Sequence, residues 1–109
     1  MNIPEVVRGL IEKYKTRNPF EISKSMDVIL VFYPLDDVNG FYQHFQRCDI
    51  IYIDERLSEL QKFLVCAHEL GHMVMHKKTN AVFMDTRTNF CTSKYELEAD
   101  RFAIDLLIP

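Results

Sequence analysis

The segment spanning residues 58–76 constrains the fold more than any other, because it predicts one long helix with a polar cluster at its centre. The stretch Ser58-Glu59-Leu60-Gln61 has the pattern of a capping box, in which the serine and the glutamine close the first helical turn reciprocally. Helical spacing of apolar residues then continues to about His76. The face expected to be apolar also carries two histidines, and it comprises Leu60, Leu64, His68, Gly71, His72 and Met75.

Two shorter helices are expected near the N-terminus. Pro4 is a favoured first helical residue, and apolar residues follow it on one stripe to about Lys15. Asn18 resembles the cap of a second helix, with Glu21 reaching back to it. This second helix is expected to be short, because strand-like residues begin at Val28.

A small antiparallel sheet of about three strands is expected in the middle of the chain. The run Val28–Tyr33 is rich in β-branched and aromatic residues. The segments Phe41–Gln46 and Asp49–Ile53 flank a polar turn and predict a hairpin. Asn39-Gly40 favours positive φ, so we expect a turn there that leads into the hairpin.

The last part of the chain predicts one further helix. The polar stretch after the long helix holds Val82-Phe83-Met84, a candidate short strand. Thr92 or Ser93 is expected to cap a helix that runs to Pro109. Because the sequence has no repeats and no internal linker, these elements predict a single α+β domain over residues 1–109.

The composition is that of a soluble domain and excludes several classes of function. The chain has 109 residues, 48% of them apolar, and a net charge of −3. It lacks the clustered Lys and Arg of a direct nucleic-acid surface. The longest apolar run, Val28–Tyr33, is too short to span a membrane, and the N-terminus lacks the apolar core of a signal peptide, so a cytoplasmic protein is expected. Cys48, Cys66 and Cys91 form no CxxC pair, which argues against a disulfide framework and a thiolate zinc site.

The polar cluster, His68-Glu69-Leu70-Gly71-His72, is an H-E-x-x-H motif. Residues four apart share a helix face and lie about 6 Å apart along the axis, so two imidazoles can converge on one Zn2+ ion. Glu69 follows the first histidine and is expected beside the metal, where it can act as the general base toward a water that zinc activates. Two surface histidines with a solvated glutamate are the alternative, which the apolar face disfavours.

A third ligand is needed, because catalytic zinc normally has three protein ligands and one open position. His76 lies about 12 Å along the axis from His68, which is too far for one shared ion. It is expected instead to line the cleft or to bond a carbonyl at the helix end. Lys78 stands where the third histidine of a metzincin would fall, so that class is excluded.

The last helix offers the missing ligand, because Glu96 and Asp100 are four apart on one face. Ala99 and Ala103 share that face, and such small residues, like Gly71 opposite, let two helices approach closely. We expect Glu96 to complete the zinc site. Asp100 is expected to accept the outer N–H of a ligand histidine.

Alternatives remain for both glutamates of this helix. Ser93-x-x-Glu96 is itself a capping box, so Glu96 has a structural role as its alternative. Glu98 is expected on a different helix face from Glu96 and is the second candidate for the third zinc ligand. Its alternative role is that of an exposed residue in an ion pair.

At these residues the sequence resembles the ImmA/IrrE family of zinc metallopeptidases. The resemblance rests on FLVCAHELGHMVMH, residues 63–76, and on YELEADRFAIDLLIP, residues 95–109, where Ile108 replaces the usual methionine. It covers the N-terminal part only loosely, and many members continue past the segment that ends here at Pro109. The resemblance implies a zincin-like core, with zinc held by His68, His72 and Glu96.

The leading hypothesis is a zinc-dependent endopeptidase. The resemblance implies cleavage of a helix-turn-helix repressor of a phage or mobile element, so the expected partner is a DNA-binding protein, with no direct nucleic-acid or membrane contact. Substrate backbone is expected to add along the strand Asp49–Ile53. Candidates for stabilising the oxyanion are Tyr52, Tyr95 and His76.

Two other hypotheses are weighed against this one. The first is a zinc-containing regulatory module that binds a repressor or another protein without cutting it. An intact Glu69 argues against it, because a pure binder needs no base. The second is a small α+β domain with two buried histidines and no stoichiometric metal.

Overall fold

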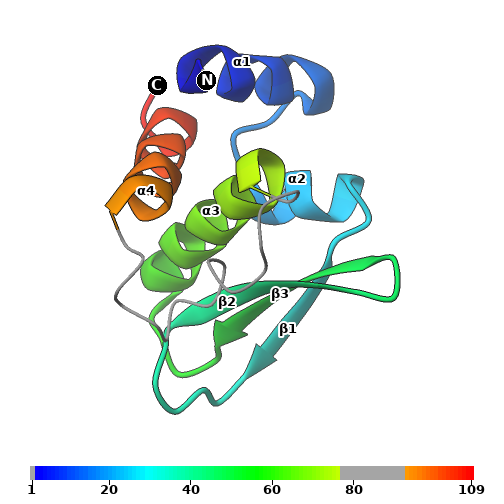
Figure 1. Ribbon diagram of the computed structural model, residues 1–109, viewed down its shortest axis with the longest axis vertical. Helices are drawn as coiled ribbons and strands as arrows, with labels where there is room; N and C mark the ends of the chain where they lie inside the picture. The colour runs from blue at the N-terminus through cyan, green and yellow to red at the C-terminus, as the bar shows by residue number, and fades with distance from the viewer. Residues whose placement is uncertain (1, 77–92) are drawn as a thin grey trace.

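The computed structural model describes residues 2–76 and 93–109, and within them the helices gather on one face of a small sheet (Figure 1). α3 packs on β2 and β3, with α4 alongside it and α1 packed against α4. The α+β class is therefore confirmed. The expected strand Val82-Phe83-Met84 and the candidate cap Thr92 lie outside the described residues. The elements are α1 (Ile3–Tyr14), α2 (Pro19–Ser25), β1 (Ile29–Tyr33), β2 (Gly40–Phe45), β3 (Cys48–Asp54), α3 (Glu59–His76) and α4 (Ser93–Leu107).

α1 begins at Ile3, one residue before the expected start at Pro4, and α2 begins directly after Asn18, as the sequence indicates. The Asn2 side chain accepts the backbone N–H of Glu5, and the Asn18 side chain accepts the N–H groups of the first turn of α2. The expectation that Glu21 reaches back to Asn18 is wrong. Its carboxylate instead accepts the hydroxyl of Thr16, whose oxygen accepts the backbone N–H of Asn18 at 3.0 Å. The threonine therefore takes the place that a capping box would give to the glutamate.

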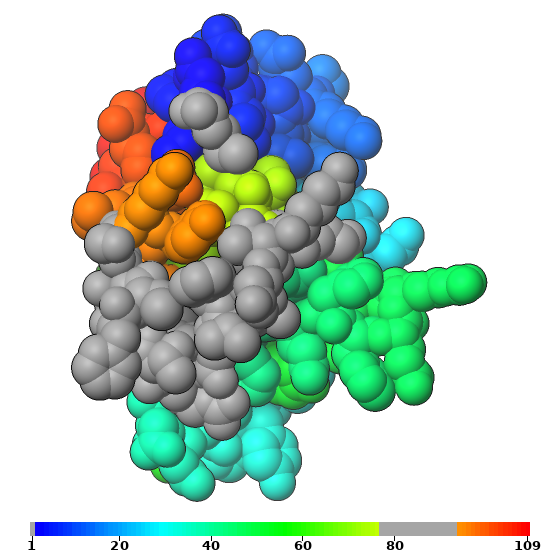
Figure 2. Space-filling view, in the orientation of Figure 1, coloured from blue at the N-terminus to red at the C-terminus, as the bar shows by residue number. Residues whose placement is uncertain are grey.

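The sheet has the order β1-β3-β2 and is mixed. β2 and β3 form the expected antiparallel hairpin, which turns at Gln46 and Arg47 with positive φ and projects beyond the helices (Figure 2). β1 pairs with β3 in parallel, from Ile29 opposite Ile50, so the expectation of a fully antiparallel sheet is wrong. The reason lies in burial: the central position covers both edges of β3, whose Ile51 and Ile53 are fully buried.

This order also corrects the expected docking strand for a substrate. The segment Asp49–Ile53 lies in β3, where Ile50–Ile53 pair with β1 on one side and with β2 on the other. A strand paired on both sides has no edge left for another chain to join. Backbone addition along Asp49–Ile53 is therefore excluded.

Gly40 is needed for close packing and not for a left-handed turn. No described glycine has positive φ, and Gly40 is already the first residue of β2. A Cβ atom there would lie 2.5 Å from Val65 Cγ1 and 2.6 Å from the carbonyl oxygen of Tyr52. The missing side chain lets the start of β2 lie directly against α3, at the edge of the cleft described below.

α3 begins with the predicted capping box, in which the Ser58 N–H donates to Gln61 Oε1 at 3.0 Å and the Gln61 N–H donates to Ser58 Oγ at 3.2 Å. Its first half is less buried than expected, since Leu60 is 67% and Leu64 47% exposed. Full burial starts at Cys66 and continues into the core between α3, α4 and the sheet. Of the helices in the described residues, none is both long and apolar enough to cross a membrane.

Candidate metal centre

Small residues bring α3 and α4 into close contact. A Cβ atom on Gly71 would lie only 2.9 Å from Phe102 Cδ1, so the bare glycine accommodates the aromatic ring of α4. Ala99 is fully buried and Ala103 nearly so in the same interface. This approach carries the first turn of α4, with Glu96, across the histidines of α3.

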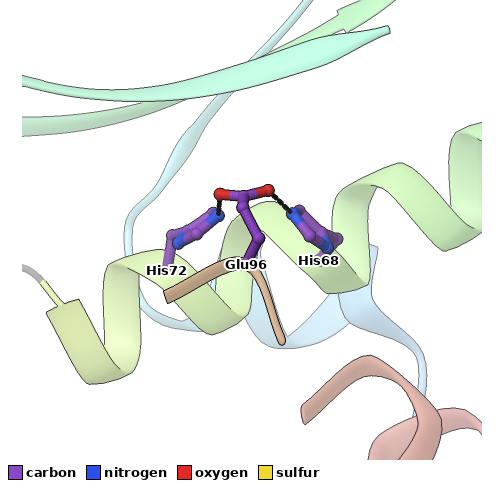
Figure 3. Close-up of side chains that lie close together, drawn as sticks. All are labelled: His68, His72 and Glu96. Atoms are coloured by element: carbon purple, nitrogen blue, oxygen red, sulfur yellow. Dashed lines mark hydrogen bonds and ion pairs between the residues drawn. The ribbon is translucent and has the colours of Figure 1, made fainter. Parts of the chain in front are cut away.

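His68, His72 and Glu96 meet at one point, with the carboxylate of Glu96 between the two imidazole rings (Figure 3). Glu96 Oε1 lies 2.9 Å from His68 Nε2, and Glu96 Oε2 lies 2.7 Å from His72 Nε2. One ligand atom from each residue lies within 4.8 Å of the others. The structure thus brings together the three residues that the sequence suggested as ligands.

This donor set fits a zinc ion. Two imidazole nitrogens and one carboxylate oxygen converge, which is a recurring ligand set of catalytic zinc. His72 is fully buried, as expected for a ligand held away from bulk water, and the side chain of His68 is 19% exposed. The second nitrogen of each ring also contacts a polar side chain, Asp100 for His68 and His76 for His72. Such contacts usually fix the orientation of metal-binding histidines.

The electrostatics of the trio reflect one shared interaction. Burial lowers the pKa of His68, but the hydrogen bond with Glu96 and the charges of Glu69, Glu96 and Asp100 outweigh it and raise the pKa to about 9. Burial raises the pKa of Glu96, but hydrogen bonds from both histidines and their charges outweigh it and lower the pKa to about 2. Without a metal, the site therefore favours a protonated His68 against an ionised Glu96.

The outer nitrogens of the two histidines meet different partners. His68 Nδ1 lies 2.9 Å from Asp100 Oδ1, the position expected for that aspartate. His72 Nδ1 lies 3.1 Å from His76 Nδ1, and His76 Nε2 lies 2.8 Å from Glu98 Oε1. His76 is therefore buried behind His72, and among the described residues its partners are His72 and Glu98 and not a carbonyl or the cleft wall.

The pairing of His76 with Glu98 was missed from the sequence. Burial lowers the pKa of His76, and the neighbouring His72 adds to this effect against the hydrogen bond with Glu98. A signal was present, because His76 continues the four-residue spacing of His68 and His72 along the same helix face. Helix spacing alone does not show which residue of another helix lies next to His76, so its contact with Glu98 could not be predicted from that signal.

A cleft of about 580 Å3 opens beside the trio, between α3, α4 and the segment of residues 37–40. His68, Glu69 and Glu96 lie on its wall, and Glu69 is only 2% exposed. None of the candidates for oxyanion stabilisation is among the described residues that line it. Tyr52 stacks on Phe41 with ring centroids 4.3 Å apart, and Tyr95 packs edge-on against His76.

The segment that closes the cleft is tied to the end of β3. The Asp54 N–H donates to the carbonyl of Asn39 at 2.8 Å, and the Arg56 guanidinium bonds both the Asp54 carboxylate and the carbonyl of Leu35. The hydrogen bond from Arg56 lowers the pKa of Asp54 to about 2. These bonds hold residues 35–39 opposite α4, so the cleft wall is part of the folded framework.

Comparison with known sequences identifies the class of protein. Residues 24–109 match the M78 peptidase family, described as the IrrE N-terminal-like domain. The match includes the H-E-x-x-H helix and all of α4. The chain therefore belongs to the ImmA/IrrE family of metallopeptidases.

Two relatives are similar over nearly the whole chain. One is the protein named Uncharacterized immunity region protein 2 of Bacillus phage phi105, 40% identical over 108 residues that cover 98% of this chain and 68% of the relative. The other is Metallopeptidase ImmA of Bacillus subtilis (strain 168), 32% identical over 108 residues that cover 97% of this chain and 63% of the relative. The chain thus spans about two thirds of the length of these relatives.

Proposed function

We propose that this chain is a zinc-dependent endopeptidase, in which His68, His72 and Glu96 hold the ion and Glu69 is the general base. The observation that carries the proposal is the convergence of two imidazoles and a carboxylate on the wall of a cleft that also bears Glu69. A set of three protein ligands leaves the open position that catalysis requires. Membership of a metallopeptidase family supports the same assignment.

The side chains divide the chemistry between them. When bound, Zn2+ supplies a Lewis acid that polarises the scissile carbonyl and makes water a stronger acid. Glu69 takes a proton from the attacking water and passes it to the departing amine nitrogen. Asp100 accepts the Nδ1–H of His68, which keeps Nε2 of that ring unprotonated for the metal.

The cleft indicates what kind of substrate fits. Val38, Leu64 and Ile104 supply apolar surface, while Asp37 and Asp100 add negative charge. A peptide crossing the cleft would place apolar side chains against these walls and its scissile carbonyl beside Glu96. A protein segment with apolar residues next to the cut bond is therefore the expected substrate.

We infer that the substrate is a helix-turn-helix repressor of a phage or mobile element, cut in the cytoplasm. One relative is named for a phage immunity region and another as a metallopeptidase, which supports this choice. The net charge of −3 fits an enzyme that acts on a DNA-bound protein and not on DNA.

Substitution Glu69→Gln tests the proposal. Glutamine keeps the size of the side chain but cannot accept the proton, so cleavage of the repressor encoded beside the gene should fall by at least about 100-fold, within the range of general-base effects. Zinc content should stay unchanged. The assay is a gel of repressor after incubation with each variant, and the control is Glu12→Gln, an exposed glutamate of α1.

Three outcomes would overturn parts of this assignment. Full cleavage by Glu69→Gln would remove Glu69 from the role of base. An uncut repressor that both forms bind tightly would favour the alternative function, a zinc-containing module that binds a repressor or another protein. Absence of zinc from the purified wild type would remove the metal site itself.

A further inference from the structure

His76 is a buried polar side chain that the proposed chemistry does not use. It is 3% exposed at the last position of α3, in contact with His72 on one side and Glu98 on the other. The ring of Tyr95 packs edge-on against it, with centroids 4.8 Å apart. A buried imidazole with both nitrogens engaged and a ring packed against it has little freedom to rotate.

The distances place His76 behind His72 and not on the metal. His72 turns Nε2 toward Glu96 and Nδ1 toward His76. The nitrogen of His76 that is nearest to the trio is therefore already engaged with the far side of the His72 ring. His76 is not a spare ligand in this arrangement.

The contacts also fix where the protons lie once His72 binds a metal. A histidine that gives its Nε2 lone pair to an ion carries its one proton on Nδ1. That proton points at His76 Nδ1, which must accept it and so cannot itself carry a proton. His76 then carries its proton on Nε2, directed at the Glu98 carboxylate 2.8 Å away. Every donor in the chain from His72 to Glu98 thus meets an acceptor.

We propose that His76, held by Glu98, is a positioning residue that fixes the tautomer and ring orientation of His72 for zinc. The Glu98 carboxylate accepts from His76, which leaves His76 Nδ1 as an acceptor and keeps the His72 proton off Nε2. This inference rests on the proposed zinc site. Two residues in series, His76 and Glu98, then support His72, whereas in the described part of the chain the outer nitrogen of His68 meets Asp100.

The test compares three variants with the wild type. His76→Phe keeps a ring against Tyr95 but removes the acceptor for His72. His76→Asn restores an acceptor oxygen close to the position of Nδ1. Glu98→Leu keeps a similar shape but leaves His76 without its carboxylate. Glu12→Gln on α1 serves as the control for loss of an exposed carboxylate.

Zinc affinity, measured by competition with a chelator, is the first readout. We expect His76→Phe to weaken binding by about 10–100-fold, Glu98→Leu to weaken it less, and His76→Asn to recover much of the loss. Thermal unfolding of the metal-free variants separates an effect on zinc from an effect on the fold. Wild-type affinity in a folded His76→Phe variant would overturn the proposal.

Imidazole nitrogen NMR of the zinc-loaded protein is the second readout. We expect His72 protonated at Nδ1 and His76 protonated at Nε2 in the wild type, and a mixed tautomer of His76 in Glu98→Leu. A His76 protonated at Nδ1 in the wild type would refute the inference. A wild type that binds no zinc would instead refute the zinc site, so the two failures are distinguishable.

Discussion

The polar contact between α3 and α4 has two ends, and each end holds the outer nitrogen of one ligand histidine in a different way. At the open end, His68 faces the cleft and its outer nitrogen meets Asp100, whose side chain is 61% exposed. At the closed end, His72 is fully buried and its outer nitrogen meets His76, which is 3% exposed and leads to Glu98. Glu96 joins the two ends through its two carboxylate oxygens.

This difference shows that a ligand histidine depends more strongly on its hydrogen-bond partner where water cannot reach the outer nitrogen. At the open end, a water molecule can replace a lost carboxylate, so the histidine keeps a hydrogen-bond partner. At the closed end, a lost acceptor leaves a buried N–H with nothing to meet it, which carries the full cost of desolvation. Equivalent substitutions at the two ends should therefore have unequal effects.

The largest effect is expected at the residue shared by both ends. Glu96→Ala removes the carboxylate that contacts both histidines and should reduce bound zinc from about one ion per chain to a small fraction, because two protein ligands hold zinc poorly. Metal analysis after dialysis measures this. Retention of zinc in Glu96→Ala, combined with its loss in Glu98→Ala, would show that Glu98 is the ligand.

A smaller effect is expected from Asp100→Ala at the open end. Solvent can supply an acceptor for the His68 N–H, so zinc affinity should fall by roughly 10-fold, at the low end of the range for such supporting groups. The same chelator competition used for His76→Phe gives the comparison directly. A loss as large as that of His76→Phe would contradict the unequal contribution of the two ends.

The smallest effect concerns the metal-free protein and its pH dependence. The pKa of His68 is raised from 6.5 to about 9, so its contribution to stability is complete below about 6.5 and is lost as pH rises through about 9. The pKa of Glu96 is lowered from 4.5 to about 2, so its contribution is lost only as pH falls through about 2.

Chelator-treated protein should therefore lose stability between about pH 6 and pH 9, and Glu96→Gln should lose less over that interval. Urea unfolding midpoints at the two pH values measure this difference. Identical pH dependence in the wild type and Glu96→Gln would show that the open end holds no charged pair without metal.

Much of the fold could be predicted because its signals are local. The caps at Asn18 and Ser58 are read from a few adjacent residues, and the structure confirms both of them. The order of the sheet could not be predicted in this way. The hairpin signal paired β2 with β3, but no local signal indicated that β1 pairs in parallel with the other edge of β3.

The candidate site shows the same division. The grouping of His68, His72 and Glu96 was predicted from helix spacing and the need for a third ligand, and the structure brings these residues together. Asp100 also lies where it was expected. The contact of His76 with Glu98 was not predicted, because it depends on the relative position of two helices and not on the spacing within one.

The sequence alone determined which side chains share a helix face. The pairs His68 and His72, and Glu96 and Asp100, follow from the helical repeat, which is set by backbone hydrogen bonds whatever the helix packs against. Only the tertiary structure decided which partner each nitrogen meets and which strand is central. Both depend on how closely the helices and strands pack against one another. Here two glycines, which have no side chain, allow the close packing: Gly71 against Phe102, and Gly40 against Val65.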